Sequence, residues 1–126
     1  MTWIMVEDKI EFFELRDRPI MPMLKLLHKY PTILPHMKCD KGAIRHIFSG
    51  SNVMAPGLTS EGGVIADGVD KGWPVAIMAE GKKHAMGIGF MMEGKGSDSL
   101  LKDPTGHAIE VALFLNDSVW RDISHQ

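Results

Sequence analysis

Two short strand-like stretches lie near the start of the chain, the apolar residues 3–6 and residues 10–15, with Glu7, Asp8 and Lys9 between them. Ile10, Phe12 and Leu15 supply the apolar positions of the second stretch, and two such stretches joined by a polar triplet predict a β-hairpin. Because an isolated hairpin is only marginally stable in water, we expect this one to lie against another part of the fold.

Apolar positions then take near-helical spacing in residues 23–30, which predicts a helix there. Pro22 suits the first helical position, because proline lacks the amide hydrogen that is unpaired at that point. Residues 32–39 lie among prolines, and a residue that precedes proline avoids the helical region. We therefore expect Pro31 to end the helix and an extended segment to follow it.

Residues 41–50 carry the clearest helical pattern in the chain. Asp40 stands where its carboxylate can accept hydrogen bonds from the unpaired amides of a first helical turn. Gly50 is suited to end the helix in a left-handed conformation. The apolar stripe of this predicted helix consists of Ala43, Ile44, Ile47 and Phe48.

Downstream of residue 61 the pattern favours strands. Residues 62–69 predict a short strand bounded by glycines, and residues 73–80 and 84–92 predict a β-hairpin with a basic tip at Lys82 and Lys83. Two glycines interrupt the second strand of this hairpin, which indicates close backbone approach or a strong bend, as in a small barrel. These glycines are Gly87 and Gly89.

The last part of the chain begins with a polar connection over residues 93–106, which contains one predicted helical turn at residues 99–102. A strand, a turn and a closing segment follow, and we assign Phe114, Leu115 and Trp120 to the core or to the closing strand. The complete pattern predicts a mainly β fold with short helices, of the α+β class, built as a small barrel.

The composition is that of an ordinary globular protein, with 126 residues, 44% of them hydrophobic and 24% charged. The formal net charge of -2 does not indicate nucleic-acid binding. Basic residues are nevertheless concentrated between Leu24 and Ser60, where Asp40 is the one acid. This concentration permits a basic face for phosphates, although a solvated helix face would give the same count. The basic residues are Lys25, Lys29, Lys38, Lys41 and Arg45.

Several classes of protein lack support in the sequence. A single cysteine excludes an intramolecular disulfide, and acids near the N-terminus interrupt the apolar core that a signal peptide needs. No apolar run approaches the roughly 20 residues that span a bilayer. We therefore expect a cytoplasmic protein.

Catalytic and metal-binding patterns are also missing. His36 and Cys39 would face opposite sides of an extended strand, so we interpret Cys39 as a structural residue rather than a nucleophile. The six histidines show no metal-binding spacing, and the glycines in residues 84–90 lie inside a strand rather than in a phosphate loop. We expect neither an enzyme nor a cofactor.

The remaining candidate site is the predicted helix and the turn-rich segment after it, residues 49–60. Asn52 and the glycines there can adopt positive φ, and Pro56 and Gly57 fit a tight turn, so the backbone can present its amides outward. Such a unit suits a ribose-phosphate backbone or an exposed RNA end. Alternatively, Val53, Met54 and Ala55 plug the end of the barrel; both interpretations can hold, and we expect Val53 and Met54 to pack inward.

The same region carries a family resemblance. The strand before Asp40, the helix opened by "DKGAI", the segment "GSNVMAPGL", two core strands and a final "FLNDSVW" resemble the PUA domain, a small RNA-binding pseudobarrel found in pseudouridine synthases and archaeosine transglycosylases. The longer stretches "LKLLHKYPTILPHMKCDKGAIRHIFSGSNVMAPGLTS" and "VAIMAEGKKHAMGIG" are similar to the malignant T-cell-amplified sequence family, translation factors that pair with density-regulated protein.

The resemblance implies a PUA domain over residues 36–126, preceded at residues 1–35 by a hairpin and helix that remain from a truncated N-terminal domain. It also implies a non-enzymatic role in translation: binding of tRNA or ribosomal RNA on the small ribosomal subunit, in support of initiation, reinitiation or recycling. A density-regulated protein homologue is an implied partner, provided that its docking surface is not on the missing domain. The implied RNA-binding residues are Lys41, Gly42, Arg45, Gly50, Ser51, Asn52, Val53, Met54, Ala55, Pro56, Gly57, Lys82 and Lys83.

A protein-interaction domain without direct RNA contact is the alternative. The net acidity and the ten methionines favour it, because flexible thioether side chains suit adaptable interfaces. Most of these methionines are expected to fill the core, and co-sedimentation with salt-washed small ribosomal subunits, with and without a density-regulated protein homologue, separates the two hypotheses.

Overall fold

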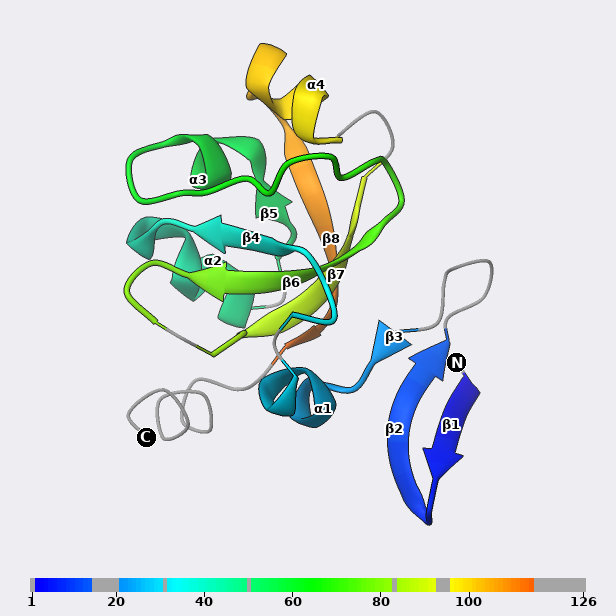
Figure 1. Ribbon diagram of the computed structural model, residues 1–126. Coiled ribbons are helices and arrows are strands. Elements are labelled where there is room, and N and C mark those ends of the chain that lie inside the picture. The colour runs from blue at the N-terminus through cyan, green and yellow to red at the C-terminus, as the bar shows by residue number, and fades with distance from the viewer. Residues whose placement is uncertain are drawn as a thin grey trace.

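The strands form two sheets, which Figure 1 shows in a computed structural model that describes residues 2–14, 21–30, 32–49, 51–82, 84–92 and 96–114. A three-stranded sheet has the order β1-β2-β3, and a five-stranded sheet has the order β4-β6-β7-β8-β5. The second sheet curls into a barrel, and the hairpin of the first projects away from it (Figure 1). The mainly β, α+β fold expected from the sequence is confirmed.

The first sheet contains the predicted hairpin. Strands β1 (Thr2–Val6) and β2 (Lys9–Glu14) pair antiparallel around Glu7 and Asp8. Both turn residues have positive φ, 50° and 67°, a combination that matches the twist of a two-residue hairpin.

The short strand β3 (Met21–Pro22) pairs with β2 and corrects the prediction for Pro22. The amide of Met23 donates to the carbonyl of Glu11 at 2.8 Å, so the chain stays extended through this point. Helix α1 (Leu24–Lys29) therefore begins after Met23, and Pro22 lies in a strand rather than in the first helical turn.

The barrel combines parallel and antiparallel pairing. The parallel pair is β4 with β6, and the pairs β6-β7, β7-β8 and β8-β5 are antiparallel. This arrangement confirms the predicted hairpin over residues 73–92. The strand bounds are β4 (His36–Cys39), β5 (Val53–Met54), β6 (Pro74–Ala79), β7 (Gly87–Met91) and β8 (His107–Phe114).

Hydrogen bonds across the gap between edge strands β4 and β5 help to close the barrel. The amide of Asp40 donates to the carbonyl of Gly57 at 2.9 Å, and Lys38 forms an isolated bridge with Val64. Of the strand predicted at residues 62–69, only this isolated bridge at Val64 forms. Gly62 and Gly68 have φ of +94° and +72°, which turns the chain away from extended pairing at both ends.

Two glycines permit the strong bend of the sheet, as the sequence indicated. A Cβ on Gly87 would lie 2.7 Å from the carbonyl oxygen of Leu113, and a Cβ on Gly89 would lie 2.5 Å from that of Glu110. The register between β7 and β8 shifts at Gly89. The backbones of the two strands approach closely because these positions carry no side chain.

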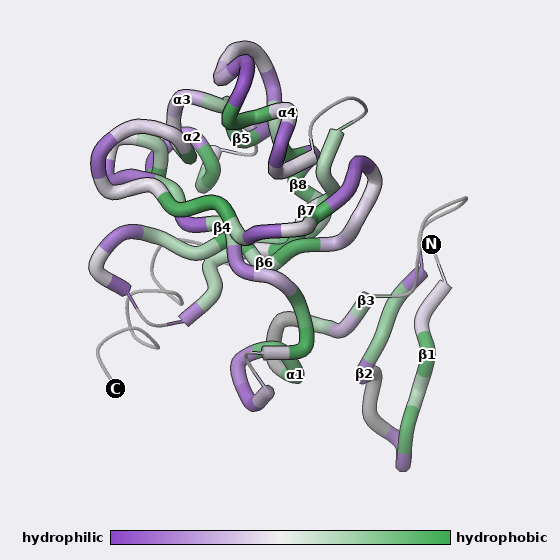
Figure 2. The backbone as a smooth tube through the Cα atoms, turned by 45° about the horizontal axis from the view of Figure 1, so that its top comes forward, coloured by the Kyte–Doolittle hydropathy of each residue, from purple (hydrophilic) through white to green (hydrophobic). Residues whose placement is uncertain are grey.

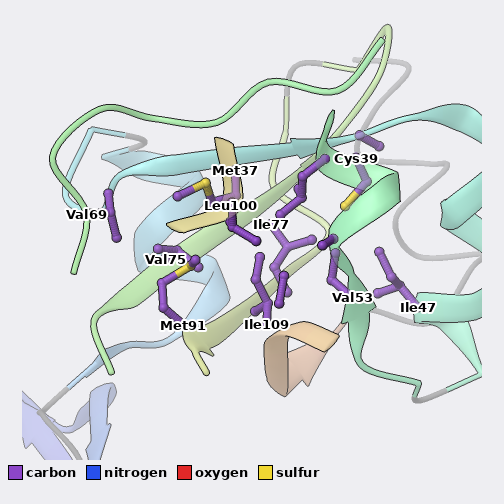
Figure 3. Close-up of a cluster of buried hydrophobic side chains, with 14 of the residues drawn as sticks. Met37, Cys39, Ile47, Val53, Val69, Val75, Ile77, Met91, Leu100 and Ile109 are labelled. Carbon is purple, nitrogen blue, oxygen red and sulfur yellow. The ribbon is translucent and has the colours of Figure 1, made fainter. Parts of the chain in front are cut away.

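One cluster of apolar side chains fills the barrel (Figure 3). Alternate residues of β6 enter it, and Ile47 of the helix and Val53 of β5 close one side. Ala43, Ile44 and Phe48 are half-buried against the same cluster, which confirms the apolar stripe predicted for that helix. The other residues labelled in the cluster are Met37, Cys39, Val69, Val75, Ile77, Met91, Leu100 and Ile109.

A second cluster joins the N-terminal elements to the outer face of the barrel. Phe13 and Met21 of the first sheet and Leu27 of α1 pack with Ile88 and Phe90 of β7. The end of the hairpin that carries Phe13 therefore lies against the barrel, as expected. The division expected between residues 35 and 36 stays a prediction, and these two parts of the chain share this cluster.

Strand β1 exposes apolar side chains, those of Trp3, Met5 and Val6. Figure 2 shows hydrophobic residues on β1 and a hydrophilic turn between β1 and β2. The helical turn predicted at residues 99–102 is the second half of α4 (Ser97–Lys102). Phe114 ends the last described strand, β8, which fits its assignment to the closing strand, but its side chain is 41% exposed and does not belong to the core. Leu115 and Trp120 lie outside the described residues. In the described part of the chain, every helix is too short or too polar to cross a membrane.

Candidate nucleic-acid interface

The candidate surface begins at the end of β4, where Asp40 starts a helix as predicted. The Asp40 carboxylate accepts a hydrogen bond from the Ala43 amide at 3.0 Å, and the Ser60 hydroxyl donates to its second oxygen. A 3-10 turn, η1 (Lys41–Ala43), leads directly into α2 (Ile44–Phe48). The cap thus fixes the first turn of the helix that carries Lys41 and Arg45.

A second carboxylate fixes the same turn from the neighbouring strand. Glu80 follows β6 and accepts a hydrogen bond from the Lys41 amide at 3.0 Å. The Glu80 carboxylate lies against Gly62, where a Cβ would approach it to 2.4 Å. Because β4 and β6 are parallel, their carboxyl ends meet at one edge of the sheet, and Glu80 links the tip of the β6-β7 hairpin to η1.

Lys41 and Arg45 are exposed on this anchored helix, as is His46. A spacing of four residues places Lys41 and Arg45 on the same side of the helix. Gly42 is exposed between them, and a Cβ there would make only an ordinary contact, 3.5 Å from an Asp40 oxygen. The structure therefore brings together two of the predicted basic residues on an accessible ridge.

The segment after α2 differs from the prediction in two ways. Val53 is buried, but Met54 is 43% exposed, because successive residues of strand β5 face opposite sides. Pro56 and Gly57 lie in helix α3 (Ala55–Thr59) rather than in a tight turn. Pro56 occupies one of the first helical positions, where its missing amide hydrogen costs nothing.

The backbone of this segment is also less open than expected. Asn52 and Gly57 do not adopt positive φ. The Ala55 amide donates to the carbonyl of Gly106 at 2.8 Å, and Asn52 Oδ1 accepts from the Val111 amide at 3.4 Å. Gly57 instead permits close packing of α3 on η1, since a Cβ there would lie 3.2 Å from that of Ala43.

The remaining predicted site residues differ in their exposure. Ser51, Met54 and Pro56 are exposed, while Val53 and Ala55 are buried in the core and cannot contact a ligand. Lys82 is half-buried near the hairpin tip, at the same sheet edge as Lys41. Gly50 and Lys83 lie outside the described residues.

Sequence reasoning missed two residues that position the surface, Glu80 and Ser60. Each reaches its partner from a distant part of the chain, over 39 residues to Lys41 and over 20 residues to Asp40. Glu80 follows a buried strand and Ser60 follows helix α3, and polar residues are common at both kinds of position, so neither carried a recognisable signal.

Cys39 lies just below this surface and is fully buried. Burial, and secondarily the neighbouring Asp40 carboxylate, raise the pKa of the Cys39 thiol from 9.0 to about 12. Both effects disfavour the thiolate, which is the reactive form of cysteine. This environment supports the interpretation of Cys39 as a structural residue.

We expect the native chain to resist thiol reagents at pH 8 and to react stoichiometrically in denaturant. Because the folded pKa is raised, the contribution of Cys39 to the free energy of unfolding should be constant below about pH 9 and fall as the pH rises from 9.0 toward 12. Titration with a chromogenic disulfide, with and without urea, measures the reactivity. Rapid labelling of the native chain at pH 8 would show that Cys39 is accessible.

Comparison with known proteins identifies the fold and the relatives of the chain. The family model described as "elF2D, PUA domain" matches residues 34–118. Malignant T-cell-amplified sequence 1 of Danio rerio is 46% identical over 115 residues, which cover 91% of this chain and 62% of the relative. Translation machinery-associated protein 20 of Saccharomyces cerevisiae is 40% identical over 117 residues, 91% of this chain and 63% of that protein.

Solved structures show the same architecture. A hypothetical protein of the archaeon Pyrococcus horikoshii has a TM-score of 0.72 at 26% identity, covering 97% of this chain and 72% of its own. A chain of an H/ACA ribonucleoprotein bound to a substrate RNA has a TM-score of 0.58 at 26% identity, covering 80% of this chain and 28% of its own.

The match covers most of this chain but only part of each of these relatives. The chain spans about 62% of the length of the Danio rerio protein, and residues 34–118 contain the whole matched domain. From this identity and the barrel described above, the chain belongs to the malignant T-cell-amplified sequence family of PUA-domain proteins.

Proposed function

We propose that this chain is a non-enzymatic RNA-binding module of the translation apparatus. It binds tRNA or ribosomal RNA on the small ribosomal subunit and so supports initiation, reinitiation or recycling in the cytoplasm. The observation that carries this proposal is the exposed pair Lys41 and Arg45 on a helix whose first turn is fixed by two carboxylates.

The helix that carries Lys41 and Arg45 is held in place before RNA binds. Asp40 and Glu80 accept hydrogen bonds from backbone amides and a hydroxyl, which fixes the first turn of the helix, while the two cationic side chains stay exposed. A rigid cationic ridge loses little conformational entropy when it meets a phosphate backbone. Ser51 and Met54, exposed beside it, offer a hydroxyl and an apolar side chain to a ribose or a base.

The relatives supply the biological setting. The PUA fold supports RNA binding, since a structurally similar chain belongs to a ribonucleoprotein that holds a substrate RNA. The yeast relative carries the name Translation machinery-associated protein 20.

The alternative, a protein-interaction domain without RNA contact, drew on the net acidity and on the methionines. Among the described residues Met5 and Met54 are the two exposed methionines, so the methionines give this alternative little support. The buried methionines are Met21, Met37, Met78, Met86 and Met91.

Co-sedimentation with salt-washed small ribosomal subunits tests the proposal. We expect the purified chain to pellet with the subunits at low salt and to be released as salt rises, because phosphate contacts release counterions. The same co-sedimentation with a density-regulated protein homologue added tests the implied partner. We propose that this homologue binds residues 1–35, the segment that contains the hairpin. Absence of binding at low salt, with and without the homologue, would contradict the proposal.

A further inference from the structure

An open pocket of about 540 Å³ lies at the other end of the barrel from Lys41. The loop before β6 and the start of α4 line it. Since β6 is about 20 Å long, at roughly 3.3 Å per residue, this pocket is separate from the surface at the far end of the strand. Its volume is in the range of pockets that take small ligands or long side chains.

The pocket has a fixed frame. The Ser97 hydroxyl accepts a hydrogen bond from the Val69 amide at 3.0 Å, and the Ser97 amide donates to the Val69 carbonyl at 2.8 Å. Gly96 permits this contact, because a Cβ there would lie 2.8 Å from the Val69 oxygen. The loop is also tied to the sheet, since the Gly72 amide donates to the carbonyl of Met91 at 2.8 Å.

Trp73 also lines the pocket. Its side chain is 48% exposed, although its backbone is paired with β7. An exposed indole on a rigid backbone offers a stacking surface at small entropic cost. Planar groups and cations both bind the faces of tryptophan rings, and the cation attraction is strongest for tryptophan.

The charged side chains around the pocket favour a cationic ligand. Asp70 and Asp98 line it and are exposed, and Lys71 is the cationic side chain among the described residues of the lining. The segments that form this end, residues 66–73 and 96–105, contain four carboxylates and two lysines. A phosphate backbone would be repelled here, whereas a cationic side chain would be attracted.

We propose that this pocket docks an arginine side chain from a basic segment of a protein partner. The guanidinium group lies on the Trp73 indole and donates paired hydrogen bonds to the carboxylate of Asp70 or Asp98. Arginine fits better than lysine because its flat guanidinium stacks on aromatic rings and matches a carboxylate with two parallel donors. The chain would then hold RNA at one end of the barrel and a basic protein segment at the other.

A nuclear magnetic resonance titration tests the docking site. The indole N–H signal of Trp73, assigned with the Trp73→Phe variant, is followed during addition of a blocked peptide with three Arg-Gly-Gly repeats. The same peptide with citrulline in place of arginine keeps the shape and removes the charge. We expect a saturable shift of the Trp73 signal with the arginine peptide and none with the citrulline peptide.

Substitutions sharpen the result. Trp73→Ala should weaken peptide binding at least tenfold, and the double variant Asp70→Asn with Asp98→Asn should do the same without touching the indole. Trp3→Ala is the matched control, because Trp3 is 49% exposed on β1, away from the pocket. The two aspartates are exposed, so their replacement tests the proposal even if Trp73→Ala fails to fold.

Three results would overturn the proposal. The arginine peptide leaves the Trp73 signal unmoved, the citrulline peptide shifts it equally, or the aspartate double variant binds as tightly as the unmodified chain. A shift produced by a single-stranded oligonucleotide and not by the peptide would assign the pocket to nucleic acid instead.

Discussion

Replacing Lys41 and Arg45 by glutamate should weaken RNA binding at low salt by roughly one order of magnitude for each reversed charge. An ion pair near a protein surface is worth about 1 kcal/mol, and reversal adds a repulsion of similar size. Both side chains are exposed and make no contribution to the buried clusters, so the fold should be unchanged. Filter binding with tRNA at low salt measures the loss.

The matched control is Lys102→Glu, which makes the same change at an exposed lysine in the last turn of α4. It alters the net charge of the chain as much as Lys41→Glu does. We therefore expect Lys102→Glu to bind within about twofold of the unmodified chain. Equal losses from Lys41→Glu and Lys102→Glu would mean that RNA responds to total charge and not to this surface.

The substitution Gly89→Ala should produce a large loss of stability, about 3 kcal/mol or more. Its Cβ would lie 2.5 Å from the Glu110 carbonyl oxygen and 2.5 Å from Cγ2 of Ile109, so strands β7 and β8 would have to separate. Overpacking of a core typically costs 1–3 kcal/mol, and a backbone atom cannot move aside as a flexible side chain does. Urea unfolding monitored by circular dichroism gives the free energy difference.

Gly42→Ala serves as the control for that experiment. Gly42 lies in η1 without positive φ, and its Cβ would make one ordinary contact at 3.5 Å. Alanine should leave the stability unchanged or raise it by a few tenths of a kcal/mol, because it reduces the entropy of the unfolded chain. If Gly89→Ala unfolds at the same urea concentration as Gly42→Ala, the close approach of β7 and β8 is wrong.

Features determined by neighbouring residues could be predicted from the sequence. The hairpin at Glu7 and Asp8, the cap at Asp40 and the apolar stripe through Ile47 depend on a few adjacent positions. The glycines of β7 also gave a correct prediction, since a strand that lacks side chains on one face has few explanations other than close approach.

Features that depend on distant contacts could not be predicted. Met54 points outward because β5 pairs with β8 in one register, and nothing within residues 49–60 specifies that register. Pro56 and Gly57 enter a helix because α3 packs on η1, although the pair favours a turn in isolation. The link from Glu80 to the Lys41 amide exists only once β4 and β6 lie side by side.

If RNA phosphates contact Lys41 and Arg45, the salt dependence of RNA binding reports the number of these contacts. Affinity for one RNA is measured over a range of salt concentrations for the unmodified chain, Lys41→Glu and Arg45→Glu. Each variant should give a plot of log affinity against log salt that is shallower by about one unit, since each loses a phosphate contact. Slopes that are the same for all three proteins would exclude these contacts.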